Sequence, residues 1–456
     1  MTTGDLLKAL LDIANLKQKS FAERMYTSPS KISKIISGKL LVSSVEANSF
    51  SEQAARIIAD EVFENNCYFK FRDIFPVIFD FSSRYDLNDF LYSAFQYTIE
   101  QDRDANGDPS GLSHNNKYYS GNKQVLYMTS IILSDYLKAD KRDRLVFYSS
   151  LQQFFGHYAS LLDKLIILPA EMKREIIFHQ LFDQDHFKTL SQEYKANILE
   201  SLFESELYSD FYRWQVKVDS SKPFLLLEDK FIMLYDKQID GTPQLTVICN
   251  RSELEHFSQL VNDLFKSAKQ MSFNHDNIQD YFNGRRDETQ SFALDEKLKT
   301  MLATPPAGSM PEQGNKQIGD LFDNMLKDEA YVYMSADSLE SFIFNAEVIV
   351  PYYLTVDLSL EERIQFSTLI RDYVAGIRPG LINIINTQLN SFSVLCEDGL
   401  SLVSLMHPAS KRVKYHLFAS ELIGPELKQA ALESGISTSD YIDRLLVQAK
   451  KKHRNH

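Results

Sequence analysis

The sequence predicts a multidomain fold, with an all-α N-terminal domain, a helical middle region and an α+β C-terminal region that holds a mixed or antiparallel sheet. Three observations lead to this prediction. Residues 1–65 repeat apolar side chains at helical spacing, and residues 66–218 show the same helical periodicity. Short apolar and β-branched runs, which are typical of strands, begin near Lys222. At 456 residues the chain is long enough for two to four domains.

Four helices are expected in the N-terminal domain: one over residues 6–14, two short ones joined by a tight corner within 16–38, and one over about 45–65. Counted from Gln18, apolar residues fall at the fourth, eighth, fifteenth and eighteenth positions, and a small residue falls at the fifth. These residues are Phe21, Met25, Ile32, Ile35 and Ala22. The spacing turns them inward and leaves small polar and basic residues on the outer face, which is how a helix-turn-helix motif is built.

This pattern resembles the Cro/C1 phage-repressor type of DNA-binding domain, also called the XRE family. Gln18 matches the glutamine that opens the first helix of the motif, and the pair Gly38–Lys39 matches the pair that closes its recognition helix. The sequence departs from the family at Tyr26, where the corner usually holds glycine, and at Ile36, where glutamate is frequent. The resemblance covers about the first 60 residues and implies that residues 1–65 bind DNA; a small helical hairpin with a polar face is the alternative.

The resemblance implies that DNA-contacting side chains lie on the outer faces of the two helices and at their ends. They are Gln18, Lys19, Thr27, Ser28, Ser30, Lys31, Ser33, Lys34 and Lys39. Ser30 and Lys34 match base-reading positions, whereas Gln18 and Lys39 are expected to contact phosphates. Residues 1–40 hold seven basic and three acidic side chains, on a chain of net charge −13. A basic module on an acidic body is the charge asymmetry expected of a DNA-binding protein.

The rest of the chain is expected to form a body behind this domain. Residues 66–218 are predicted to be a helical domain for dimerisation or sensing, with long helices over 123–162 and 169–208 and a loop over 102–123. Its many aromatic side chains suit core packing or, alternatively, the lining of a ligand cavity.

Residues 219–420 are predicted to be an α+β domain that binds an effector or a partner. Strands are expected at 224–227, 230–235, 244–249, 330–334, 391–396, 400–406 and 413–418, helices at 252–271 and 360–375, a hairpin turn at 240–241 and a loop at 304–314. Residues 421–456 are predicted to be a C-terminal helical hairpin with a basic tail. The hairpin either docks on the α+β domain or forms part of a ribbon-helix-helix element.

The sequence carries no nucleotide-binding, zinc-protease or paired-cysteine motif, so we expect no enzymatic activity, no cofactor and no metal. Cys67, Cys249 and Cys396 lie far apart, which indicates a reducing compartment without a disulfide framework. No apolar run is long enough to span a membrane and no secretory signal opens the chain. A cytoplasmic location and no membrane partner are therefore expected.

Together these features predict a bacterial or phage transcriptional regulator that binds double-stranded DNA sequence-specifically. It is expected to be a homodimer that responds to an unknown small-molecule or peptide effector. Two alternatives stay open: a protein-interaction scaffold whose helix-turn-helix no longer binds DNA, and an enzyme-like domain that carries this motif as a headpiece.

Overall fold

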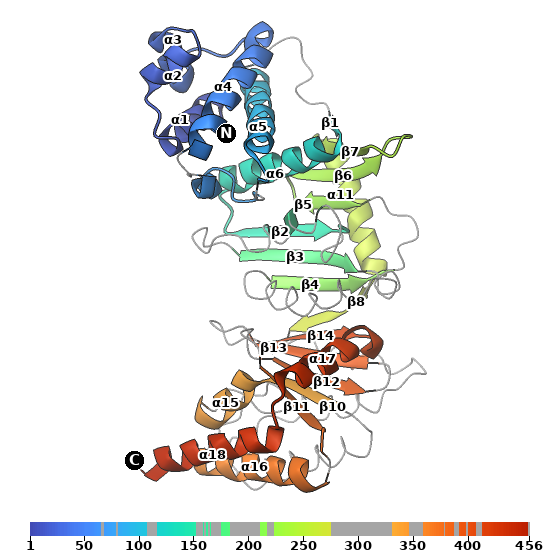
Figure 1. Cartoon of the computed structure of the whole chain (residues 1–456). Coiled ribbons are helices and arrows are strands. Elements are labelled where there is room, and N and C mark those ends of the chain that lie inside the picture. Colours follow the sequence, from blue (N-terminus) through green and yellow to red (C-terminus); the bar gives the residue numbers. More distant parts are fainter. Residues whose placement is uncertain are drawn as a thin grey trace. The chain divides into compact units, whose positions relative to one another are not determined.

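The chain forms two compact units in the computed structural model (Figure 1). Unit 1 comprises Met1–Leu181, Tyr208–Asp210 and Val218–Ser267, and unit 2 comprises Phe182–Leu207, Phe211–Lys217 and Ala268–His456. The structure describes residues 1–64, 68–78, 81–106, 116–151, 158, 161–162, 165, 175–182, 210–216, 223–274, 331–345, 359–377, 379–386, 392–397, 400–406 and 413–454.

Unit 1 begins with five helices, which we call the headpiece. They are α1 (Thr3–Ile13), α2 (Gln18–Arg24), α3 (Pro29–Ile36), α4 (Ser44–Glu64) and α5 (Arg84–Ala105), with a short 3-10 helix, η1 (Tyr68–Asp73), between the last two. Local capping explains two of the starts. Thr2 and Asp5 form a reciprocal capping box on α1, and the Ser28 hydroxyl accepts the backbone N–H of Lys31 at 3.2 Å while Pro29 occupies the first turn of α3.

The long helices α4 and α5 pack directly against each other. Small buried residues on α4, such as Ala54 and Ala55, let the two helices approach, and the rings of Phe50 and Phe95 meet edge to face at 5.9 Å. Arg84 at the start of α5 forms an ion pair with Asp60 of α4 at 3.0 Å. The predicted domain boundary at residue 65 therefore falls between two helices that share one core.

A sheet follows in unit 1, with the strand order β1-β7-β6-β5-β2-β3. Neighbouring strands are antiparallel except β2 and β3, which are parallel. The strands are β1 (Lys117–Ser120), β2 (Arg144–Ser149), β3 (Glu175–Phe182), β5 (Phe224–Leu227), β6 (Phe231–Lys237) and β7 (Pro243–Ile248). Unit 1 also contains the helices α6 (Asn122–Ala139) and α11 (Arg251–Ser267). Gly241, at φ 85°, makes the turn between β6 and β7 at the predicted hairpin.

Unit 2 holds a six-stranded sheet of order β11-β10-β12-β13-β14-β9, antiparallel apart from the parallel pair β10 and β11. Its strands are β9 (Ser272–Asn274), β10 (Tyr331–Ser335), β11 (Ile382–Ile385), β12 (Phe392–Glu397), β13 (Leu400–Met406) and β14 (Val413–Phe418); β4 (Asp210–Gln215) pairs with β8 (Lys269–Gln270). The helical elements are α15 (Ala336–Asn345), α16 (Leu360–Asp372), the π-helix η3 (Tyr373–Ile377), α17 (Ser420–Ser434) and α18 (Thr438–Arg454). One apolar core joins α15, α16 and α18 to the sheet.

The predicted fold class is confirmed, with N-terminal helices, a helical middle and a strand-rich C-terminal region. The middle region differs in detail, because it also contains the strands β1, β2, β3 and β4. The helix expected over 123–162 ends at Ala139 and is followed by β2, and the helix expected over 169–208 contains β3. Short apolar runs such as Leu145–Tyr148 fit a buried strand as well as a helix, and sheet pairing decides between them.

At the C-terminal end the docked hairpin is the arrangement found, because Ile442, Leu445, Leu446 and Ala449 of α18 lie in the core of unit 2. Gly435, at φ 59°, caps α17, and Pro425 lies inside this helix because α17 begins at Ser420. The predicted loop at 304–314 and Cys67 lie outside the described residues. None of the helices that the structure describes is long and apolar enough to cross a membrane.

Candidate nucleic-acid interface

The helices α2 and α3 lie where the helix-turn-helix is predicted, with Tyr26 at the corner between them. The backbone N–H of Tyr26 donates to the Glu23 carbonyl at 3.1 Å, and that of Thr27 donates to the Ala22 carbonyl at 3.0 Å. This bonding holds Tyr26 at φ 51°, the left-handed conformation that glycine adopts without strain. Its side chain is 92% exposed, so no packing compensates for the strain. The corner therefore has the backbone geometry expected from the resemblance, but with an exposed aromatic residue.

The inner faces of the motif are buried as predicted. Phe21, Ala22, Met25, Ile32 and Ile35 all belong to the core. On the other side of this core, α1 approaches α3 closely at a glycine: a Cβ atom placed on Gly4 would lie 2.6 Å from the carbonyl oxygen of Ile35 and 2.7 Å from that of Ile36. Because no side chain separates the two backbones there, α1 fixes the position of the C-terminal end of α3.

The outer face carries the predicted DNA-contacting residues. Gln18, Lys19, Ser28, Ser30, Ser33, Lys34 and Lys39 are exposed, and Thr27 and Lys31 are half-buried. Gly38, at φ 69°, ends α3, and the backbone N–H groups of Lys39 and Leu40 then donate to the Lys34 carbonyl at 2.9 and 3.1 Å. These bonds hold Lys39 directly after α3. In Figure 1, α2 and α3 lie at the rim of the headpiece, away from the strands of unit 1.

Acidic residues of α4 neutralise part of the basic charge. The Lys31 ammonium lies 2.9 Å from the Glu46 carboxylate, and the hydrogen bond and charge of Lys31 lower the pKa of Glu46 below its ordinary value. Arg24 forms an ion pair with Glu61 of α4. Among the described residues, Lys8, Lys17, Lys19, Lys34 and Lys39 form no ion pair. The exposed face of the motif therefore keeps a positive charge that comes mainly from Lys19, Lys34 and Lys39. Sequence reasoning missed Glu46, because nothing in the local spacing pairs it with Lys31.

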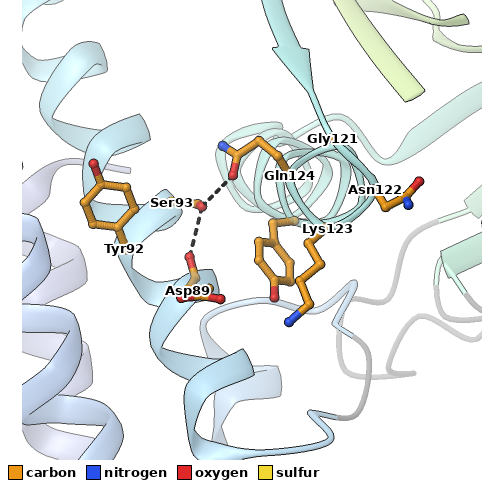
Figure 2. A pocket seen from close by; sticks show the side chains of 8 residues that line it. Asp89, Tyr92, Ser93, Gly121, Asn122, Lys123 and Gln124 are labelled. Carbon is orange, nitrogen blue, oxygen red and sulfur yellow. Dashed lines mark hydrogen bonds between the residues drawn. The ribbon is translucent and has the colours of Figure 1, made fainter. Parts of the chain in front are cut away.

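A polar pocket of about 440 Å³ lies between α5 and the start of α6 (Figure 2). It is lined by Asp89, Tyr92, Ser93, Gly121, Asn122, Lys123, Gln124 and Tyr127. The Ser93 hydroxyl lies 3.0 Å from the Asp89 carbonyl oxygen and 3.1 Å from Gln124 Oε1, so it links the two walls. Sequence reasoning did not find this pocket, because its walls come from separate helices.

A buried carboxylate supports the pocket. Burial raises the pKa of Asp86, but hydrogen bonds from the Tyr127 hydroxyl (2.5 Å) and the Lys123 ammonium (3.1 Å) outweigh this and hold the pKa below its ordinary value. Asp86 is therefore ionised at neutral pH and fixes Lys123 at the pocket. The same helix α5 contacts α1, because Asp102 accepts the backbone N–H of Thr3 at 2.9 Å. The helix α5 therefore lines the pocket and also contacts α1.

Comparison with known proteins leaves the family open. No family model matches the chain. No curated protein matches it in sequence. Among solved structures, TrmBL2, described as an archaeal chromatin protein with a novel mode of DNA binding, is aligned over 59% of this chain and 100% of its own, with 7% sequence identity and a TM-score of 0.22. A TM-score this low supports no conclusion about this chain, so the resemblance of residues 1–65 to the Cro/C1 type stays a prediction.

Proposed function

We propose that the protein is a sequence-specific DNA-binding transcriptional regulator that inserts α3 into the major groove. One observation carries the proposal: the five apolar residues at the family's core positions are buried, while the nine polar and basic residues at its contact positions reach solvent. A DNA-reading motif requires this separation of a buried apolar face from an exposed polar face. The apolar face anchors the recognition helix to the core, and the polar face stays free to contact bases.

Within this proposal the side chains divide into two groups. Ser30 and Lys34, on the outer face of α3, contact base edges, and a lysine–guanine contact is worth about 1–3 kcal/mol of discrimination. Gln18, Lys19, Thr27 and Lys39 contact phosphates, which fixes the register of α3 but carries no sequence information. Because Lys19 and Lys39 are the charged members of this group, most of the salt dependence of the DNA affinity should come from them.

The body supplies dimerisation and sensing in this proposal. A single small headpiece buries about 600–1,000 Å² on DNA, too little for a selective site alone, so a homodimer is expected. The pocket at α6 is where we place a small polar effector. Its α5 wall carries Asp89 and Ser93, and the same helix holds α1 through Asp102 and α4 through Arg84. A ligand that shifts α5 would therefore shift the helices that position α3.

The test compares Lys34→Ala with Lys141→Ala in the full chain. Lys141 is an exposed lysine between α6 and β2, so its removal changes the net charge equally but leaves α3 intact. Fluorescence anisotropy against a library of duplexes should show that Lys34→Ala loses preference at one base pair of each half-site, while Lys141→Ala keeps the wild-type preference. Unchanged preference in Lys34→Ala would refute the assignment.

A second candidate is a protein-interaction scaffold, which is favoured by apolar side chains exposed beside the motif. Val45 is 90% exposed, and Leu40, Leu41 and Tyr26 also reach solvent. A scaffold of this kind would show no salt-sensitive affinity for DNA, so the same titrations separate the two functions.

A further inference from the structure

The ion pair between α3 and α4 places an acid on the proposed DNA-binding face. Lys31 lies on α3 between Ser30 and Ser33, two of the expected contact positions, and its ammonium is 2.9 Å from the Glu46 carboxylate. Both side chains are partly exposed, Lys31 at 36% and Glu46 at 49%. A phosphate that approaches Lys31 must therefore either displace Glu46 or accept a carboxylate as a near neighbour.

Stability alone does not account for this arrangement. An ion pair with this exposure contributes little to folding, because water screens the attraction and both side chains lose freedom. The carboxylate of Glu46 lies in the first turn of α4, where the helix dipole favours it whether or not Lys31 is bound. The pair thus adds little to the fold, while it removes one cation from the surface that must attract phosphate.

We propose that Glu46 holds the Lys31 ammonium away from DNA phosphates and so limits the non-specific affinity of the headpiece. The inference rests on the proposed DNA-binding function and deepens it. Non-specific affinity comes almost entirely from phosphate neutralisation, whereas discrimination comes from base contacts. Removing one phosphate contact from every sequence lowers the competition from non-specific sites and leaves the contacts of Ser30 and Lys34 unchanged.

The test is Glu46→Gln in the full chain, titrated with a short mixed-sequence duplex over a range of salt concentrations. The amide keeps the size of the side chain but releases Lys31. The variant should bind more tightly, and the slope of log K against log salt should steepen by about 0.9 for one added phosphate contact, which is roughly 8-fold in affinity at about 0.1 M salt. Unchanged thermal unfolding would show that the fold is intact.

Two controls isolate the pair. Glu52→Gln removes the same charge from the same helix, but Glu52 forms no ion pair among the described residues and so releases no lysine. Lys31→Ala is then made in both backgrounds. It should barely change the salt slope of the wild-type chain, and it should abolish the gain in Glu46→Gln.

Each result has a definite meaning. The inference is supported if the salt slope steepens in Glu46→Gln and stays unchanged in Glu52→Gln. Adding Lys31→Ala to Glu46→Gln must also restore the wild-type slope. Equal effects of the two glutamine variants, or a wild-type slope that already falls by about one unit in Lys31→Ala, would overturn it while leaving DNA binding intact. A wild-type chain without salt-dependent affinity for any duplex would instead overturn the proposed function.

Discussion

Gly4 is the position where a single methyl group should disturb the recognition helix most directly. It lies in α1, and a Cβ atom there would meet the carbonyl oxygens of Ile35 and Ile36 at 2.6 and 2.7 Å. Both contacts are with backbone, so no side chain can rotate away. Gly4→Ala must therefore push the C-terminal end of α3 away from α1 by roughly half an ångström.

Two effects of opposite sign determine how much Gly4→Ala changes the free energy of unfolding. Alanine in place of glycine in a helix normally gains about 0.5–1 kcal/mol. Overpacking of a close contact costs about 1–3 kcal/mol, and more where only backbone can move. The cost is larger, so Gly4→Ala should lower the free energy of unfolding of the headpiece by about 1–2 kcal/mol. Because α3 moves, specific DNA binding should weaken more than non-specific binding.

The assay combines thermal unfolding and amide hydrogen exchange over α1 and α3 with titrations against specific and mixed-sequence DNA. Gly376→Ala is the matched control: Gly376 lies in the helical element η3, and a Cβ placed on it meets no atom of another segment within 4 Å. That variant should be neutral or slightly stabilised. If Gly4→Ala gains stability as Gly376→Ala does and binds DNA as the wild type does, then α1 does not position α3.

Two further predictions concern the headpiece, and a third concerns dimerisation through the body. Tyr26→Gly should raise the free energy of unfolding by up to about 1 kcal/mol, since it relieves the strain at φ 51° and removes no packing; a loss of stability in denaturant unfolding would show that the exposed ring has a structural role. Lys39→Ala should weaken binding to all duplexes by a similar factor and lower the salt slope by about one unit, and a change confined to one base pair would contradict the phosphate assignment. The full chain should be a dimer by light scattering, and a fragment that ends after Asn106, so that α5 still covers α4, should be a monomer; a monomeric full chain at micromolar concentration, free and on DNA, would refute dimerisation through the body.

Much of the headpiece could be predicted from the sequence because its determinants are local. The buried positions of α2 and α3 follow from helical spacing counted within twenty residues, and the left-handed corner at Tyr26 follows from the same register. The hairpin at Gly241 was found for a similar reason, since a two-residue turn signal lies between two apolar runs.

The features that the sequence did not reveal depend on contacts between distant segments. The pair of Lys31 and Glu46 spans fifteen residues, and the bond from Thr3 to Asp102 spans ninety-nine. Strands β2 and β3 were expected to be helical, because their apolar runs are too short for periodicity to separate the two structures. The pocket at α6 likewise exists only once α5 and α6 are packed together.

Selection of bound fragments from a pool of random duplexes by the purified full-length protein tests the central claim most directly. The account predicts enrichment of a pseudo-palindromic site whose half-sites lie about one helical turn apart, with an affinity that falls steeply as salt is raised. It also predicts that Lys34→Ala loses the preference at one position of each half-site. A pool that stays unenriched, with no salt-dependent binding by the wild-type chain, would contradict the claim that α3 reads DNA.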